Sequence, residues 1–171
     1  EYKGLFPMLK AFKRGLKEVK DVTLHIVGGG PLYERIKTFI AKEGLMKNIK
    51  LYGHMLREKA LKILAKSSFL VHPSFYESYC MSIVEAYALG KPVIAHKAGY
   101  ANEMVKEVGA GIVVDARDLK EFSDALTSLL IDRNLYKRLS YNAEKAAKEK
   151  FDIKITARKY ESLYRELLNR G

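Results

Sequence analysis

The sequence lacks the features of a secreted or membrane-spanning chain. Only one of its 171 residues is a cysteine, Cys80, so no internal disulfide can form, and this is typical of a protein from a reducing compartment. No run of residues is long and apolar enough to cross a bilayer, and the first residues lack the pattern of a signal peptide. We therefore expect a cytoplasmic protein.

Acidic residues are too few to balance the basic ones. The chain has 31 Lys plus Arg against 20 Asp plus Glu, a formal net charge of +11. Such a surplus favours anionic partners, which include polyanions, lipid head groups and negatively charged ligands. Because the charge is spread over several helical segments, without an RNA-binding aromatic motif or a basic recognition helix, nucleic acid is the less favoured partner.

The pattern of hydrophobic residues predicts one α/β domain spanning residues 1–171. Short β-like runs alternate with amphipathic helical runs, which is typical of a parallel sheet covered by helices on both faces. The expected strands are 22–27, 49–52, 69–72, 92–95 and 112–114. The expected helices are 5–19, 31–40, 57–66, 82–89, 118–130, 133–150 and 154–169.

Two glutamates bracket the most informative segment, residues 77–85 (ESYCMSIVE). The step from Glu77 in a loop to Glu85 in a helix can place one carboxylate beside a hydroxyl-rich ligand and the other about two turns deeper. The backbone amides between them lie at the start of a helix, which is suited to a phosphate group. The segment therefore predicts a site for a phosphorylated, hydroxyl-rich ligand.

This segment, with several others in the same order, resembles the donor site of retaining glycosyltransferases of the glycogen-synthase and mannosyltransferase-like family. The matching pieces are Lys3-Gly4, 24–31 (LHIVGGGP), 49–53 (IKLYG), 69–74 (FLVHPS), 77–95, 98–103 (AGYANE) and 111–115 (GIVVD). The resemblance implies one Rossmann-like half of a two-domain GT-B enzyme, with a doubly wound parallel sheet. In that family a strand ending in Gly-Arg precedes the Lys-Gly turn, so we expect the first, central strand upstream of Glu1.

The resemblance also implies roles for individual residues. Glu85 would accept hydrogen bonds from the ribose hydroxyls, and Glu77 would hold the hexose of a nucleoside-diphosphate sugar. Lys3 would stabilise charge on the diphosphate. The implied catalytic residues are Lys3 and Glu77, and the implied donor-binding residues are Gly28, Gly30, His54, Glu77, Tyr79, Cys80, Met81, Ser82 and Glu85. The family has glycines where this chain has Ser78 and Cys80, which narrows the loop.

Each of these residues also has a simpler interpretation. Ser82 and Glu85 match a capping box, in which Ser82 caps the helix and Glu85 bonds back to the Ser82 amide. Glu77 can be a solvated loop acid, and Lys3 one of many surface lysines. His54 follows a strand, where the family places its base-contacting loop, but it can equally be a polar loop residue.

The sequence lacks the motifs for dinucleotide binding, metal binding and hydrolysis. Residues 28–31 (GGGP) miss the third glycine and the later acid of a dinucleotide fingerprint. His25, His72 and His96 lie in or beside strands without metal-ligand spacing, so we expect buried, hydrogen-bonded imidazoles and no metal or other cofactor. No Gly-x-Ser-x-Gly elbow or Cys-His pairing indicates a hydrolase.

We interpret the chain as the donor-binding half of a glycosyltransferase that moves a hexose to a glycan or lipid-linked acceptor. Its expected partners are the sugar donor, the acceptor and an N-terminal domain of the same enzyme. The basic residues of the first helix, Lys10, Lys13, Arg14, Lys17 and Lys20, suggest an anionic membrane surface at the inner face. Alternatives are half of a sugar-nucleotide epimerase, a regulatory relative that binds a nucleotide sugar as a signal, and a basic nucleic-acid-binding module.

Overall fold

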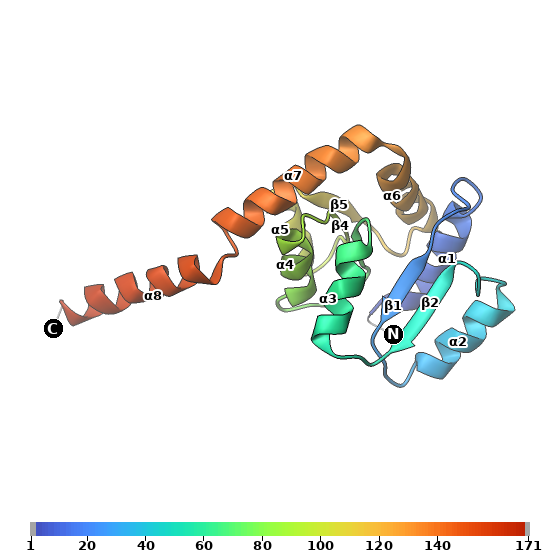
Figure 1. Ribbon diagram of the computed structural model, residues 1–171, viewed down its shortest axis with the longest axis horizontal. Coiled ribbons are helices and arrows are strands. Elements are labelled where there is room, and N and C mark those ends of the chain that lie inside the picture. The colour runs from blue at the N-terminus through green and yellow to red at the C-terminus, as the bar shows by residue number, and fades with distance from the viewer. Residues whose placement is uncertain (1–2, 170–171) are drawn as a thin grey trace.

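A computed structural model describes residues 3–169 and has the predicted alternation of strands and helices (Figure 1). The predicted domain limits, residues 1 and 171, lie outside the described residues. The strands are β1 (Leu24–Val27), β2 (Ile49–Gly53), β3 (Leu70–His72), β4 (Val93–His96) and β5 (Gly111–Val114). The helices are α1 (Leu5–Gly15), α2 (Tyr33–Lys42), α3 (Arg57–Lys66), α4 (Met81–Ala88), α5 (Tyr100–Val108), α6 (Leu119–Ile131), α7 (Arg133–Glu149) and α8 (Ile153–Leu168).

Most predicted boundaries lie within a few residues of the observed ones, and the exceptions have local causes. Pro31 was expected at the first position of a helix, but α2 begins at Tyr33, whose amide closes a turn onto the Gly30 carbonyl. The first helix ends at Gly15 rather than near Val19, because residues 16–18 continue as turns. Helix α3 has the predicted limits.

The five strands form two parallel sheets, and the predicted α/β class with parallel strands is confirmed. In one sheet β1 pairs with β2, and in the other the order is β3-β4-β5. Among the described strands, β1 therefore has a partner on one side only, and so does β3. The order of strands reverses between these two edges, which is where doubly wound sheets place their ligand crevice.

A groove of about 1150 Å³ separates the two sheets. Its walls come from β1 and β3 and from apolar side chains of the surrounding helices, including Met8 and Phe12 of α1 and Leu61 and Leu64 of α3. None of the residues of α3 is buried, although its limits match the sequence pattern. The apolar face of α3 thus borders the groove instead of a closed core.

Two clusters of buried side chains hold the domain together. One joins α1 and α6 to both sheets through residues such as Leu9, Ile26, Ile94 and Phe122. The other packs α4, α5 and α7 against β4 around Tyr87. The second cluster fixes α4. Residues 77–85, between the two glutamates, span the loop before this helix and its first residues.

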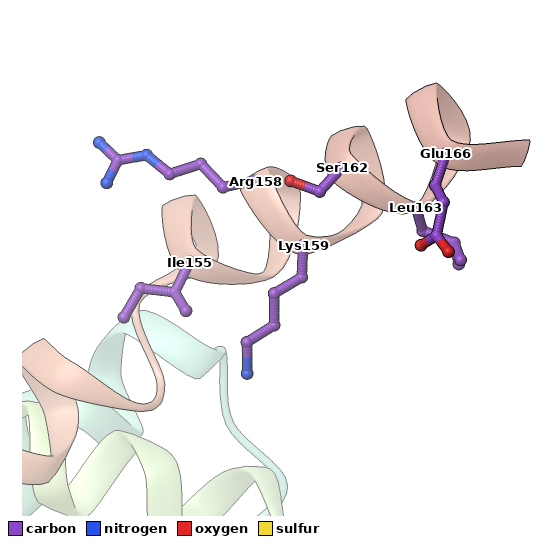
Figure 2. A pocket seen from close by; sticks show the side chains of 6 residues that line it. All are labelled: Ile155, Arg158, Lys159, Ser162, Leu163 and Glu166. Atoms are coloured by element: carbon purple, nitrogen blue, oxygen red, sulfur yellow. The ribbon is translucent and has the colours of Figure 1, made fainter. Parts of the chain in front are cut away.

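Helix α8 extends away from the rest of the domain (Figure 1) and buries none of its residues. Its apolar residues Ile153, Tyr160, Tyr164 and Leu168 are all exposed. A shallow hollow of about 430 Å³ follows this helix, where the Arg158 side chain reaches outward and Lys159 points back toward the domain (Figure 2). This hollow is separate from the groove between the sheets.

Candidate functional site

Lys3 is fixed beside Glu77 by the turn that precedes α1. Gly4 has a positive φ of 64°, and a Cβ atom at this position would lie 2.1 Å from the carbonyl oxygen of Pro73. Glycine is therefore required for the start of α1 to lie against the loop that follows β3. That contact brings the Lys3 ammonium group into an ion pair with the Glu77 carboxylate.

Glu77 also lies near His72, whose Nε2 is 3.9 Å from its carboxylate. Burial lowers the pKa of His72, and the Glu77 carboxylate only partly opposes this effect. The imidazole is therefore neutral at pH 7, and Lys3 is the cation that compensates Glu77. The interpretation of Glu77 as a merely solvated loop acid does not fit these contacts.

The structure corrects one expectation of the sequence analysis, because Cys80 and His72 are in contact. The Cys80 Sγ atom lies 3.4 Å from Nε2 and 3.5 Å from Nδ1 of His72. Burial raises the pKa of the Cys80 thiol and lowers that of the His72 imidazole, so both groups are held neutral. A nucleophilic cysteine needs the opposite shifts. The pair therefore packs the loop and does not indicate a hydrolase.

The capping box, which was the simpler interpretation of residues 82–85, does not form. Helix α4 begins at Met81 with Cys80 at its N-cap position, and no side chain caps it. Ser82 contacts the Cys80 sulfur at 3.1 Å. Glu85 instead accepts a hydrogen bond of 2.7 Å from Nε of Arg57, on α3. The Glu85 carboxylate is thus directed to the start of α3, away from its own helix start.

His54 and the glycine turn after β1 form a neighbouring wall of the site. The Gly28 amide donates to the Gly53 carbonyl at 2.8 Å, which joins the ends of β1 and β2. A Cβ atom on Gly29 would lie 2.6 Å from Cδ2 of His54, so the imidazole packs directly on the glycine backbone. Only glycine allows this approach.

The groove is lined by half of the predicted site residues. Those that line it are Lys3, Gly28, Gly30, Ser82 and Glu85. Glu77 joins them through Lys3, and His54 joins them through Gly29. The Cys80 side chain is buried against His72, while Tyr79 and Met81 are about half exposed and do not line the groove. These three residues are therefore not part of the groove wall.

Two residues of this region were missed by the sequence analysis. Arg57 had no motif to mark it, because its partner Glu85 lies 28 positions further on. Tyr100 stacks on Tyr79 with ring centroids 5.7 Å apart. Its substitution was visible in the sequence, since residues 98–103 match a family segment that has glycine at this position, but no role was assigned to it.

The described residues hold no group of three His, Cys, Asp or Glu side chains arranged for a metal ion. Within residues 3–169, none of the helices has the length and apolar character needed to cross a bilayer. Among Lys, Arg, Asp and Glu, the residues that line the groove are Lys3, Asp21, Lys66 and Glu85.

Comparison with known families agrees with this geometry. Residues 1–146 match the family described as glycosyl transferases group 1. The chain belongs to this family, and the resemblance stated from the sequence is confirmed.

Among curated relatives, the chain is 26% identical over 165 residues to alpha-D-kanosaminyltransferase of Streptomyces kanamyceticus, covering 96% of this chain and 43% of that protein. It is also 28% identical over 136 residues to the GDP-mannose-dependent alpha-mannosyltransferase of Corynebacterium glutamicum, covering 80% of this chain and 32% of that protein. The chain thus spans less than half the length of these curated relatives.

Solved structures share the fold. Anabaena Alr3699/HepE in complex with UDP-glucose superposes with a TM-score of 0.82 at 25% identity, over 96% of this chain and 46% of that one. The structural neighbours are GT-B glycosyltransferases, which confirms the prediction of a Rossmann-like half of that architecture.

Proposed function

We propose that this chain is the donor-binding half of a retaining glycosyltransferase that transfers a hexose from a nucleoside-diphosphate sugar to a glycan or lipid-linked acceptor. One observation carries the proposal: a single groove at the strand-order reversal gathers Lys3, Gly28, Gly30, Ser82 and Glu85. The Anabaena relative, which was solved with UDP-glucose, supports the class of donor.

Glu85 is the proposed partner of the ribose. Glu85 lines the groove, and its side chain is only 21% exposed and bonds to Arg57 rather than to its own helix start. An ionised carboxylate can accept both hydroxyl groups of a ribose, and hydrogen bonds to charged groups are stronger than neutral ones. His54, packed on Gly29, would then lie on the base side of the nucleotide.

The start of α4 and Lys3 are the proposed diphosphate site. Backbone amides at the start of a helix bind anions because they lack partners within the helix and lie at the positive end of its dipole. Lys3 adds a full positive charge to this proposed diphosphate site. These groups would stabilise negative charge that develops on the departing nucleoside diphosphate as the bond to the sugar breaks.

Glu77 is the proposed sugar contact. A carboxylate near a diphosphate is unfavourable unless a cation or donor groups compensate it, and here Lys3 supplies the cation. A hexose hydroxyl could replace part of that contact when Lys3 turns to the phosphates. The pair therefore links recognition of the sugar to charge stabilisation at its anomeric carbon.

The proposed activity belongs to the whole enzyme rather than to this half alone. Transfer requires an acceptor held against the anomeric carbon, and the groove residues provide contacts for the donor only. We place the acceptor site on a second domain facing the groove, and the enzyme in the cytoplasm. The exposed lysines and Arg14 of α1 are the proposed contact with an anionic inner membrane surface, which liposome flotation at low and physiological salt would test.

Calorimetry of nucleotide binding tests the proposal. The chain is titrated with UDP, GDP and UDP-glucose, and Glu85→Gln is expected to weaken the nucleotide that binds by about 1 to 3 kcal/mol, because a hydrogen bond to a charged acceptor is lost. Glu18→Gln, an exposed acid after α1, is the matched control. Unchanged affinity for Glu85→Gln, or no binding by the wild type to any of the three ligands, would contradict the proposal.

Glu77→Ala separates sugar recognition from nucleotide binding in the same titrations. If Glu77 contacts the hexose, the variant reduces the difference in affinity between UDP-glucose and UDP while largely sparing UDP. Equal losses for both ligands would remove Glu77 from the sugar site.

A further inference from the structure

Within the described structure, Arg57 is the residue that holds the side chain of Glu85, a groove-lining residue, in a defined position. Its Nε donates to Oε1 of Glu85 at 2.7 Å, joining the first residue of α3 to the middle of α4. The Arg57 side chain is 71% exposed, whereas that of Glu85 is 21% exposed. The ion pair therefore lies where the shielded carboxylate meets solvent.

The pair leaves most of the Glu85 carboxylate available. Two carboxylate oxygens offer about four lone-pair positions, and the Arg57 hydrogen bond uses one of them, on Oε1. A ribose diol needs two acceptors, which Oε2 and the second lone pair of Oε1 can supply. Arg57 and a ribose can thus bind the same carboxylate at the same time.

Arg57 also connects the two walls of the nucleotide site. Helix α3 follows β2 after a short loop that contains His54, and His54 packs on Gly29. Arg57 therefore links α3, which begins next to His54 on the base side, to the Glu85 carboxylate on the ribose side. The relative placement of these two walls sets the distance between base and ribose contacts.

The energetics favour a role in binding over a role in folding. An exposed ion pair contributes little to stability, because its charges are solvated and both long side chains lose freedom. The same contact matters more to a ligand, because a glutamate already held in one orientation need not be ordered when the ribose binds.

Building on the proposed function, we infer that Arg57 is a positioning residue that orients Glu85 for the ribose hydroxyls of the donor nucleotide. Its effect on affinity passes through Glu85 and the ribose. A direct contact of Arg57 with the phosphates or the base would act independently of both.

The test is a binding cycle over two residues and two ligands. Wild type, Arg57→Met, Glu85→Gln and the double variant are titrated with UDP or GDP, whichever the wild type binds more tightly, and with its 2′,3′-dideoxy counterpart. Arg57→Met is expected to weaken the ribonucleotide roughly 3- to 10-fold. In the Glu85→Gln background, and with the dideoxy ligand, the same substitution is expected to have no effect.

Control variants separate orientation from net charge. Lys59→Met removes an exposed cation from the same helix and is expected to leave affinity unchanged at physiological salt. Arg57→Lys retains the charge and is expected to recover part of the lost affinity for the ribonucleotide only. Equal recovery for the dideoxy ligand would point to a direct contact and overturn the inference.

The outcomes are distinct from those that test the proposed function. If the wild type binds neither ribonucleotide, the proposed function fails and this inference fails with it. If the wild type binds but Arg57→Met weakens the ribonucleotide and the dideoxy ligand equally, or neither of them, only the role of Arg57 is overturned. If Arg57→Met still weakens binding of the ribonucleotide in the Glu85→Gln background, the role of Arg57 is likewise overturned.

Discussion

At the scale of single residues, the site depends on charges that are compensated before any ligand binds. Lys3 pairs with Glu77, and Arg57 pairs with Glu85. Each pair joins segments far apart in the sequence, so each carboxylate is held by a different part of the fold. A ligand that enters the groove thus meets two acidic groups that are already oriented.

His96 is a residue at which pH is expected to act on stability. It is buried, and its Nδ1 accepts a hydrogen bond of 3.0 Å from the Ala116 amide, which requires an unprotonated Nδ1. Burial lowers the pKa of His96 despite the nearby Asp115 carboxylate. The folded state therefore binds fewer protons than the unfolded state between the lowered pKa and the ordinary value of about 6.5. The stability is present above pH 6.5 and is lost as the pH falls through the lowered pKa.

Urea unfolding at pH 7.5 and at pH 5.5 checks this expectation, with a lower free energy of unfolding at pH 5.5. His96→Asn retains a side-chain acceptor for the Ala116 amide but cannot titrate, so its loss between the two pH values should be smaller. Burial also lowers the pKa values of His25 and His72, and both remain in the variant. An identical pH dependence in the two proteins would show that His96 does not carry the effect.

At the scale of secondary-structure elements, local capping signals were less reliable than the hydrophobic pattern. Two segments of the sequence have the pattern of a capping box, residues 82–85 and 118–121. In the second, Asp118 does cap α6, but Glu121 bonds to the Asp115 amide instead of returning to Asp118. In the first, neither residue caps α4. A capping motif indicates the hydrogen bonds that a segment can form by itself. A residue from another part of the fold can take over one of its side chains, as Arg57 does with Glu85.

The cap of α6 gives a prediction on stability. Asp118 accepts hydrogen bonds from the amides of Lys120 and Glu121 at 2.9 and 3.0 Å. Asp118→Ala is expected to lower the free energy of unfolding by about 0.5 to 2 kcal/mol, measured by urea titration. Asp118→Asn keeps an acceptor and should lose much less. Ser82→Ala serves as a comparison at a residue that caps nothing, and a loss there as large as that of Asp118→Ala would contradict the assignment of the two helix starts.

At the scale of the whole molecule, the order of helices and strands along the chain was predictable from the sequence. The contacts between elements that are distant in the sequence were not. Apolar periodicity located each strand, and every helix except α5, to within a few residues, because burial of one face dictates that spacing. The glutamates, Lys3 and the glycine turn were identified through the family resemblance. The ion pairs, the Cys80–His72 contact and the separation of the sheets depend on segments that meet only in three dimensions, so no local pattern encodes them.

The groove between the sheets leads to a prediction about strand addition. The facing edges of β1 and β3 each lack a partner among the described strands, and apolar side chains line the space between them. Lys3 and Gly4 lie at the end of this groove where β3 ends, since Gly4 packs on Pro73. A strand parallel to β1 and β3, joined directly upstream, would therefore pair with both edges and fill the part of the groove between them. The proposed donor site lies beyond the carboxyl ends of the strands, at Lys3, Gly28 and Glu85, and would stay open.

Chains extended upstream by about six residues test this prediction. A valine- and isoleucine-rich extension is expected to raise the melting temperature and the denaturant midpoint. It should also raise the dependence of unfolding free energy on urea, because more surface becomes buried in the folded state. The matched control has the same length with a proline and two lysines at its centre, which removes a ladder hydrogen bond and places charge in the apolar groove. Equal stability of the two extended chains, or stabilisation only with dimer formation in sedimentation experiments, would show that the groove does not accept a strand from its own chain.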